Sequence, residues 1–319
     1  MSIRAALILV CGSVAVSAHA QTYPVKPVRL VSPFPPGSSA DVTSRLYAPK
    51  LTEALRQQFI VDNRPGAAGN IGAETVARAS ADGYTLLTAP AALASSRSMY
   101  KKLTFDIVRD FEPISMLTTS AQLLAVRASL AVKSVKELIA LAKSQPGQLT
   151  YASTGTGGSG HLTMELFRLQ AGIDLVHVPY KGSSTAVPDL IGGQVDMMFS
   201  SSIALLPHLK AGRIRALGIT SAKRSAVLPE LPTIAESGLP GFEAVGWSAL
   251  LAPAKTPRSI VALLNSTIAK IAQAPDVVER LAAQGAAPLA STPEHTRSIV
   301  RGEVVKWEKV IKAAGIRAE

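Results

Sequence analysis

The chain has 319 residues, a formal net charge of +11 and a single cysteine, Cys11. One cysteine excludes a disulfide scaffold, a zinc–thiolate site and, once an N-terminal signal is removed, a cysteine nucleophile. The positive charge favours anionic partners through its long-range field. The basic residues are scattered and not gathered in blocks, so we expect no nucleic-acid partner.

The first twenty residues have the pattern of an export signal. Arg4 supplies a positive charge, residues 5–18 form an apolar run too short to span a bilayer, and Ala18-His19-Ala20 matches an A-x-A cleavage site. We therefore expect cleavage after Ala20 and a periplasmic location. The alternatives are an uncleaved anchor and lipid attachment at Cys11.

The segments that follow alternate between strands and helices, which is typical of an α/β fold. In the first series we expect strands at 28–32, 59–61 and 84–88, with helices at 41–55 and 70–80. Pro49 is expected to kink or split the first helix. In the second series we expect strands at 123–126, 149–153, 175–178, 195–199 and 215–220, and helices at 134–144, 160–171, 184–191 and 204–211.

The second series opens on a capping-box pattern at Ser134-Val135-Lys136-Glu137. After it, residues 221–248 are rich in proline and glycine and are expected to be irregular, before a strand at 249–252. In the tail, Thr256-Pro257 and Thr292-Pro293 each predict an N-cap followed by an N1 proline. The last helix has apolar residues at helical spacing and is expected to end at Gly315.

Two α/β series indicate two lobes. We predict one lobe from residues 22–121 plus 249–319 and a second from residues 122–248. Two strand crossings, near residues 117–124 and 244–252, would join the lobes as a hinge. A cleft between the lobes is the natural place for a small ligand.

Two loops between a strand and a helix have the composition of an anion site, one in each predicted lobe. They cover residues 33–41 and 153–161. The N-terminus of a helix carries unpaired N–H donors and a partial positive charge, which suit a carboxylate or phosphate. Glycine lets the backbone approach a ligand closely, and the Ser and Thr hydroxyls add donors. The purely structural alternative is that each loop is an ordinary tight connection between a strand and a helix.

Enzyme motifs fit poorly. Gly155-x-Gly157-x-x-Gly160 matches the dinucleotide fingerprint, but the acidic residue expected about 20 residues later is missing. The same loop lacks the last glycine of a G-x-S-x-G elbow, because His161 stands there. The histidines are far apart in the sequence, so we expect no metal site. We predict no cofactor and no catalytic residue.

Several single residues allow two interpretations. Asp41, at the start of the first helix, is expected to bond backbone N–H groups and so to shape its loop. His161 either contacts a ligand or caps its helix, and His177 is expected to pack within a strand. Phe34 and Tyr180 are candidate aromatic side chains of the cleft. Trp247 would either line its floor or pack the hinge.

Taken together, these motifs identify a resemblance. The chain resembles the Bug family, the extracytoplasmic solute receptors of tripartite tricarboxylate transporters, from about Tyr23 to Gly315. The ordered motifs that carry the resemblance are Tyr23-Pro24-x-Lys26-Pro27, Phe34-Pro35-Pro36-Gly37 with Ala40-Asp41, Asn63-Arg64-Pro65-Gly66-Ala67, Asp82-Gly83-Tyr84-Thr85-Leu86, Tyr151-Ala152-Ser153, His177-Val178-Pro179-Tyr180-Lys181-Gly182, Gly192-Gly193-Gln194-Val195-Asp196, Leu231-Pro232-Thr233-Ile234-Ala235-Glu236 and Ala252-Pro253-Ala254.

The resemblance implies a periplasmic, two-lobed Venus-flytrap protein that binds a small organic acid, is no enzyme, and serves a membrane permease of the tripartite tricarboxylate type. We expect a monomer. The alternatives are a ligand sensor for a membrane kinase and an exported hydrolase. In the family, the two loops grip carboxylate oxygens. The family pattern differs at two positions, where Ser38 replaces a usual glycine and Ser200 a frequent aspartate.

The loops and the resemblance together give one set of predicted ligand-binding residues. These are Phe34, Gly37, Ser38, Ser39, Ala40, Asp41, Thr88, Ala89, Ser153, Thr154, Gly155, Thr156, Gly157, Ser159, His161, Tyr180 and Ser200.

Overall fold

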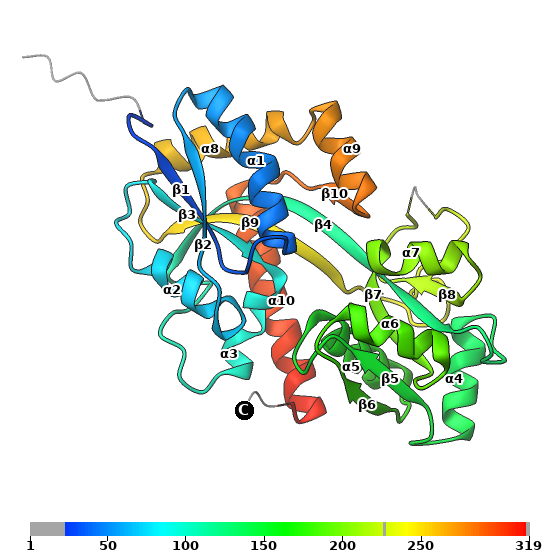
Figure 1. Cartoon of the computed structure of the whole chain (residues 1–319). Helices are drawn as coiled ribbons and strands as arrows, with labels where there is room; N and C mark the ends of the chain where they lie inside the picture. The colour runs from blue at the N-terminus through cyan, green and yellow to red at the C-terminus, as the bar shows by residue number, and fades with distance from the viewer. Residues whose placement is uncertain (1–22, 226–227, 317–319) are drawn as a thin grey trace, which may run out of the picture.

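The computed structural model describes residues 23–225 and 228–316, so the predicted export signal and its cleavage site lie outside the described residues. Strands and helices alternate along the chain and build two lobes around one curled mixed sheet (Figure 1). Within the described part, no helix is both long and apolar enough to cross a membrane.

The sheet runs in the order β2-β1-β3-β9-β4-β7-β5-β6, and β8 and β10 also pair with β4. The strands are β1 (Val28–Ser32), β2 (Phe59–Asn63), β3 (Thr85–Pro90), β4 (Phe111–Arg127), β5 (Thr150–Ser153), β6 (Val176–Pro179), β7 (Met197–Ser201), β8 (Ile214–Ile219), β9 (Val245–Pro253) and β10 (Ala286–Pro288). β1, β2 and β3 are parallel, as are β5, β6 and β7, whereas β4 and β9 run antiparallel to their neighbours.

Helices cover the sheet in both lobes. They are α1 (Ser39–Leu55), α2 (Asn70–Ala77), α3 (Ser96–Met99), α4 (Val135–Ser144), α5 (Ser159–Ala171), α6 (Ser183–Gly192), α7 (Ser202–Lys210), α8 (Arg258–Ile271), α9 (Pro275–Ala283) and α10 (Pro293–Ala314), with the 3₁₀ turns η1 (Ala67–Gly69) and η2 (Ala91–Ala94). The alternating series predicted from the sequence is confirmed, with most bounds shifted by one to three residues.

β4 is the strand that joins the lobes. It pairs with β9 up to Ala121 and with β7 from Gln122 onward, and Figure 1 shows β4 and β9 running together from one lobe toward the other. The sequence predicted only its last part, 123–126. Residues 111–122 were not predicted as a strand, because two register shifts and the polar run 118–120 break the alternation expected of a strand.

Two predictions about α1 and α8 differ from the structure. α1 is not split at Pro49, since it runs as one helix whose buried side chains include Leu46, Tyr47 and Leu51; a kink at Pro49 stays a prediction. Its packing outweighs the single backbone bond that a proline removes, and the Tyr47 hydroxyl also donates to the Leu117 carbonyl at 2.8 Å. At α8, Pro257 itself is the N-cap.

The last helix follows its prediction closely. Thr292 is the N-cap of α10, its side chain accepts from the His295 N–H, and Gly315 ends the helix with φ +66°. The apolar stripe of α10 is buried, and the helix packs on β4 of the sheet and on α5 of the second lobe. α10 therefore contacts both lobes.

The predicted N-cap of α4, Ser134, is also confirmed, although the N3 carboxylate bonds the N–H one residue before the cap and so departs from a strict capping box. The Ser134 hydroxyl accepts from the Glu137 N–H at 3.2 Å, and the Glu137 carboxylate accepts from the Lys133 N–H at 2.7 Å. We expect Ser134→Ala to lower the free energy of unfolding by about 1 kcal/mol, because the amide loses its acceptor. Urea unfolding measures this loss. Ser144→Ala is the matched control at the exposed end of the same helix and should change little; an equal loss at both positions would contradict the assignment.

Candidate functional site

A cleft of about 520 Å³ lies between the lobes, and both lobes supply its walls. Its floor comes from β4 and β9, through residues such as Ser120, Gln122 and Trp247. The walls are rich in hydroxyl groups and carry a few large apolar side chains. Among the described residues that line the cleft, none carries a charged side chain. An anion in this cleft would therefore depend on hydroxyl and backbone donors.

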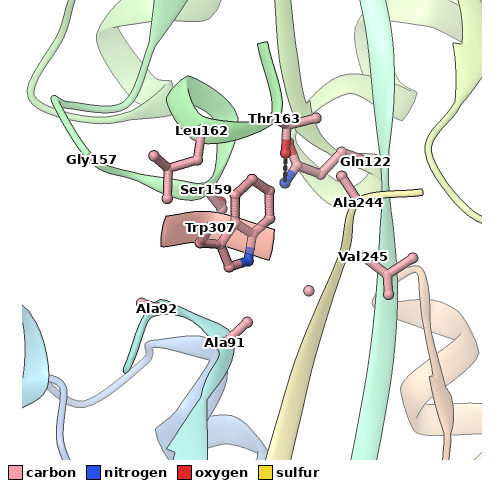
Figure 2. A pocket seen from close by; sticks show the side chains of 11 residues that line it. Ala91, Ala92, Gln122, Gly157, Ser159, Leu162, Thr163, Ala244, Val245 and Trp307 are labelled. Atoms are coloured by element: carbon pink, nitrogen blue, oxygen red, sulfur yellow. Dashed lines mark hydrogen bonds between the residues drawn. The ribbon is translucent and has the colours of Figure 1, made fainter. Parts of the chain in front are cut away.

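A smaller pocket of about 30 Å³ adjoins the cleft beside α5 (Figure 2). Its lining includes Leu162 and the Trp307 indole, and it shares Gln122 and Ser159 with the cleft. The Gln122 amide nitrogen donates to the Thr163 hydroxyl at 3.3 Å, while the Gln122 side-chain oxygen has no hydrogen-bond partner among the described residues. The pocket has room for about one water molecule or one methyl group.

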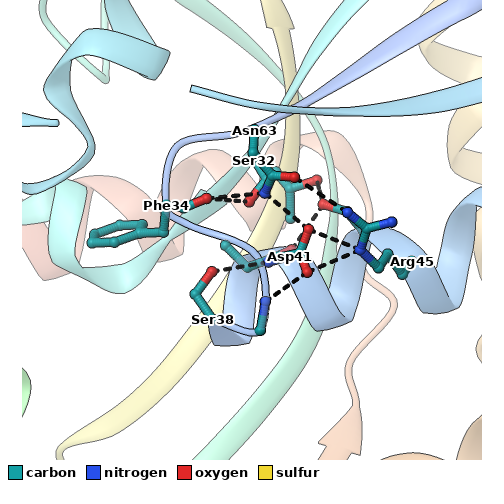
Figure 3. A network of polar contacts seen from close by, with 10 residues as sticks. Ser32, Phe34, Ser38, Asp41, Arg45 and Asn63 are labelled. Atoms are coloured by element: carbon teal, nitrogen blue, oxygen red, sulfur yellow. Dashed lines mark hydrogen bonds and ion pairs between the residues drawn. The ribbon is translucent and has the colours of Figure 1, made fainter. Parts of the chain in front are cut away.

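The first loop is held by Asp41 (Figure 3). Gly37 has φ +82°, a conformation that favours glycine, and its N–H donates to Asp41 Oδ2 at 2.9 Å. Ser38 is the N-cap of α1, and its hydroxyl accepts from the Asp41 N–H at 3.3 Å. The prediction that Asp41 bonds backbone N–H groups and shapes its loop is confirmed.

Asp41 is buried and fully engaged. Its carboxylate also accepts from Asn63 Nδ2 at 2.9 Å and from Arg45 Nε at 2.9 Å. Burial raises the pKa of Asp41, but the hydrogen bonds from Arg45, Gly37 and Asn63 outweigh burial and hold the pKa below its ordinary value. The negative charge of Asp41 is thus compensated by hydrogen bonds within the protein.

The second loop repeats this arrangement with a different acceptor. Gly157 has φ +77°, and its N–H donates to His161 Nδ1 at 2.9 Å. Gly158 is the N-cap of α5 and donates to the Gly155 carbonyl at 3.1 Å. A Cβ at Gly160 would lie 2.6 Å from the Phe199 carbonyl oxygen, so glycine is needed for the close approach of α5 to β7.

Some first-turn amides of α1 and α5 remain free. Within residues 23–225 and 228–316, the amides of Ser39, Ala40, Ser159 and Gly160 donate to no acceptor of the chain. Ser39, Ser159 and Gly160 line the cleft. The two helix N-termini therefore present unpaired donors from opposite lobes to one cavity, which is the chemistry that binds a carboxylate.

The predicted ligand-binding residues divide into three groups. Those that line the cleft are Phe34, Gly37, Ser38, Ser39, Thr154, Ser159 and Ser200. Gly157 lines the smaller pocket. Those that line neither cavity are Ala40, Asp41, Thr88, Ala89, Ser153, Gly155, Thr156, His161 and Tyr180.

The members of the third group that make side-chain bonds make them to the protein. Thr88 is fully buried, and its hydroxyl oxygen accepts from Ser44 at 2.8 Å. The Tyr180 hydroxyl donates to Asp189 at 2.8 Å. A direct side-chain contact from either residue to a ligand would first have to break these bonds. The set of ligand-contacting residues stays a prediction.

Sequence reasoning missed much of the cleft. Further lining residues come from β4, from the end of α9 with the start of β10, and from three other positions: Thr118, Ser120, Ala121, Gln122, Leu281, Gln284, Gly285, Ala286, Ala91, Ala92 and Ser183. The polar run in an otherwise buried strand is a signal that was present for β4. Trp247 was proposed for the cleft floor or the hinge, and it both lines the cleft and lies in β9.

Removing the Asp41 carboxylate should destabilise the protein. In Asp41→Ala, Gly37, Asn63 and Arg45 all lose an acceptor, so we expect a loss of about 3 kcal/mol in the free energy of unfolding. The lowered pKa also fixes a pH dependence. The stabilisation is complete above the ordinary pKa and is lost as the pH falls through the lower folded value.

The measurement is denaturant unfolding from pH 6 down to pH 2. The wild type should lose stability below about pH 4 more steeply than Asp41→Asn, which has no proton to gain there. Asp174→Asn is the control, because Asp174 is 63% exposed. Parallel curves for the wild type and Asp41→Asn would contradict the assignment.

Comparisons with known proteins show the family and the fold of this chain. The family model described as "Tripartite tricarboxylate transporter family receptor" matches residues 43–316. BugT of Bordetella pertussis is 39% identical over 313 residues, which cover 98% of this chain and 96% of BugT.

Two solved structures are also similar. R. palustris Rpa4515 with adipate has 39% identity and a TM-score of 0.78, covering 93% of this chain and 100% of that one. MatC from Rhodopseudomonas palustris with bound malate has 32% identity and a TM-score of 0.73, covering 91% of this chain and 100% of MatC. The predicted two-lobed α/β fold is confirmed. The chain belongs to the tripartite tricarboxylate transporter receptor family, the TctC or Bug family of periplasmic solute receptors.

Proposed function

We propose that this protein captures a small carboxylate-bearing organic acid in the cleft and releases it unchanged. One observation carries the proposal: free first-turn amides of α1 and α5 meet at a cavity without charged lining residues among those described. A charge-assisted hydrogen bond contributes about 1.5–3 kcal/mol. Three or four such bonds, with burial of the ligand body, give about −8 kcal/mol, a micromolar dissociation constant.

The cleft supports a compact acid with more than one polar end. A volume of about 520 Å³ suits a small molecule, and its lining includes the hydroxyl groups of Ser120, Ser183 and Ser200, which belong to neither loop. Relatives of similar structure hold adipate and malate. We therefore propose a dicarboxylate. Closure of the lobes would expel water and strengthen the amide contacts.

The wider role follows from the family. We propose export with cleavage after Ala20, a monomer of two lobes covering 22–121 plus 249–319 and 122–248, and delivery of the ligand to a membrane permease of the tripartite tricarboxylate type. β4 and the start of β9 would act as the hinge. A sensor role toward a membrane kinase uses the same binding site. Binding of the purified receptor to permease-containing membranes, dependent on ligand, would distinguish the two roles.

A hydrolase is the second candidate, because Ser153 Oγ lies 2.7 Å from His177 Nε2. A nucleophile and a base at this distance form part of a catalytic triad. Ser153 is fully buried, however, and does not line the cleft; its Oγ instead accepts from the Gly155 N–H at 3.2 Å. This pair supports the loop and does not face a substrate. Ester turnover abolished by Ser153→Ala would revive the hydrolase.

The proposed function predicts stabilisation by ligand. Mature protein, unfolded and refolded to remove any bound acid, should melt at a higher temperature with adipate, malate or succinate. At 100 times the dissociation constant, the gain in the free energy of unfolding is about 2.7 kcal/mol. Thermal scanning of a panel of mono-, di- and tricarboxylates checks this. The matched diamides, which lack charge, should give no shift. A panel without any stabilising acid would reject the proposal.

A further inference from the structure

We propose that His161 is a positioning residue: its neutral ring holds the second anion loop in shape, as the Asp41 carboxylate holds the first. This inference rests on the proposed function, since it concerns how the carboxylate-binding loop is built. Under this proposal, His161 shapes the loop and does not contact the ligand. The argument depends on the equivalence of the two loops, on the atom that accepts the bond and on the surroundings of the ring.

The two loops share one backbone design. In each, a glycine with positive φ, +82° at Gly37 and +77° at Gly157, donates its N–H to the side chain four residues later at 2.9 Å. The next residue is the helix N-cap, with φ and ψ of −70° and 162° at Ser38 and −66° and 162° at Gly158. The loops therefore differ mainly in the acceptor, a carboxylate in one and an imidazole in the other.

The imidazole can accept only when it is neutral. His161 Nδ1 receives the Gly157 N–H, so the ring proton must sit on Nε2. His161 is only 4% exposed, and its ring stacks on His177 with the centroids 4.0 Å apart. Burial, His177 and Arg168 lower the pKa of His161 to about 4, so the ring stays neutral over the range in which carboxylates are ionised.

The charged and titratable groups around the ring are already paired. Tyr151 of β5 donates to Glu165 of α5 at 2.5 Å, and Arg168 Nε donates to Glu165 at 3.2 Å. His177 of β6 bonds to Ser153 at 2.7 Å. Among the described residues, Arg168 acts on the His161 ring only through its charge and bonds to Glu165 and Asp174, so position 161 lacks the hydrogen-bonded cation that Arg45 gives Asp41. An anionic acceptor at position 161 would lie unpaired beside the bound carboxylate.

Three substitutions separate this role from simple packing. His161→Asn keeps a neutral side-chain acceptor within reach of the Gly157 N–H. His161→Leu fills the buried space without an acceptor, and His161→Asp supplies an acceptor with an unpaired charge. If His161 only fills space, the leucine variant should bind the acids at least as tightly as the asparagine variant, because the site is buried. If His161 positions the loop, the asparagine variant should bind more tightly than the leucine variant. If the acceptor must be neutral, the asparagine variant should also bind more tightly than the aspartate variant.

The experiment measures the dissociation constants for adipate and malate by calorimetry at pH 7, with circular dichroism to verify folding. We expect His161→Asn to bind within about threefold of the wild type, and His161→Leu and His161→Asp to bind at least tenfold more weakly. His295→Leu, at the start of α10, is the matched control and should bind as the wild type does. If the leucine variant binds as tightly as the asparagine variant, the positioning role is overturned. If the aspartate variant binds as tightly as the asparagine variant, the requirement for a neutral acceptor is overturned.

A second readout does not depend on the ligand. Hydrogen exchange of the Gly157 amide, followed by NMR, should be slow in the wild type and in His161→Asn, and at least tenfold faster in His161→Leu. If the wild type bound no acid of the mono-, di- and tricarboxylate panel while this exchange pattern held, the proposed function would fail and the loop assignment would stand. If all three proteins exchanged alike, the positioning role would fail even with tight binding.

Discussion

The first turn of a helix has amides that its own backbone is unable to satisfy, and this constraint organises the site. α1 and α5 each begin at the cleft. In each loop a glycine amide is satisfied by a side chain further along the helix, Asp41 in one case and His161 in the other. The amides of Ser39, Ala40, Ser159 and Gly160 are left free among the described residues. Under the proposed function, an anion between the lobes would complete both helix ends without any charged side chain, and the basic surface of the chain would add only a long-range attraction.

The floor of the cleft holds the N-termini of α1 and α5 in their relative positions. β4 runs through both lobes, and α10 packs on β4 and α5. Glu303 of α10 accepts from the Trp247 indole of β9 at 3.3 Å, which ties α10 to a strand of the floor. The same carboxylate accepts from the Trp307 indole one turn along α10 at 2.9 Å, and Trp307 lines the smaller pocket. The C-terminal helix therefore contacts the floor strand β4 and the helix α5, whose N-terminus lines the cleft.

The fold and the two strand-to-helix loops at the cleft could be predicted from the sequence because these features depend on local rules, whereas anion binding by the loops stays a prediction. Strand and helix alternation, the N-caps Ser134 and Thr292 and the role of Asp41 all follow from short-range chemistry. The extent of β4 did not follow, because the polar residues that serve the cleft erase its strand pattern. The lining by Leu281, Gln284, Gly285 and Ala286 depends on packing between distant segments, which no local sequence pattern indicates. Thr88 and Tyr180 show the opposite case, since polar side chains near the loops form bonds within the protein.

The central claim is that one carboxylate is shared by two helix N-termini from opposite lobes. A crystal structure of the mature protein with adipate tests it most directly. The account predicts carboxylate oxygens within about 3 Å of a free amide of Ser39 or Ala40 and of one of Ser159 or Gly160. An acid bound elsewhere in the cleft, or held chiefly by a charged side chain, would contradict it.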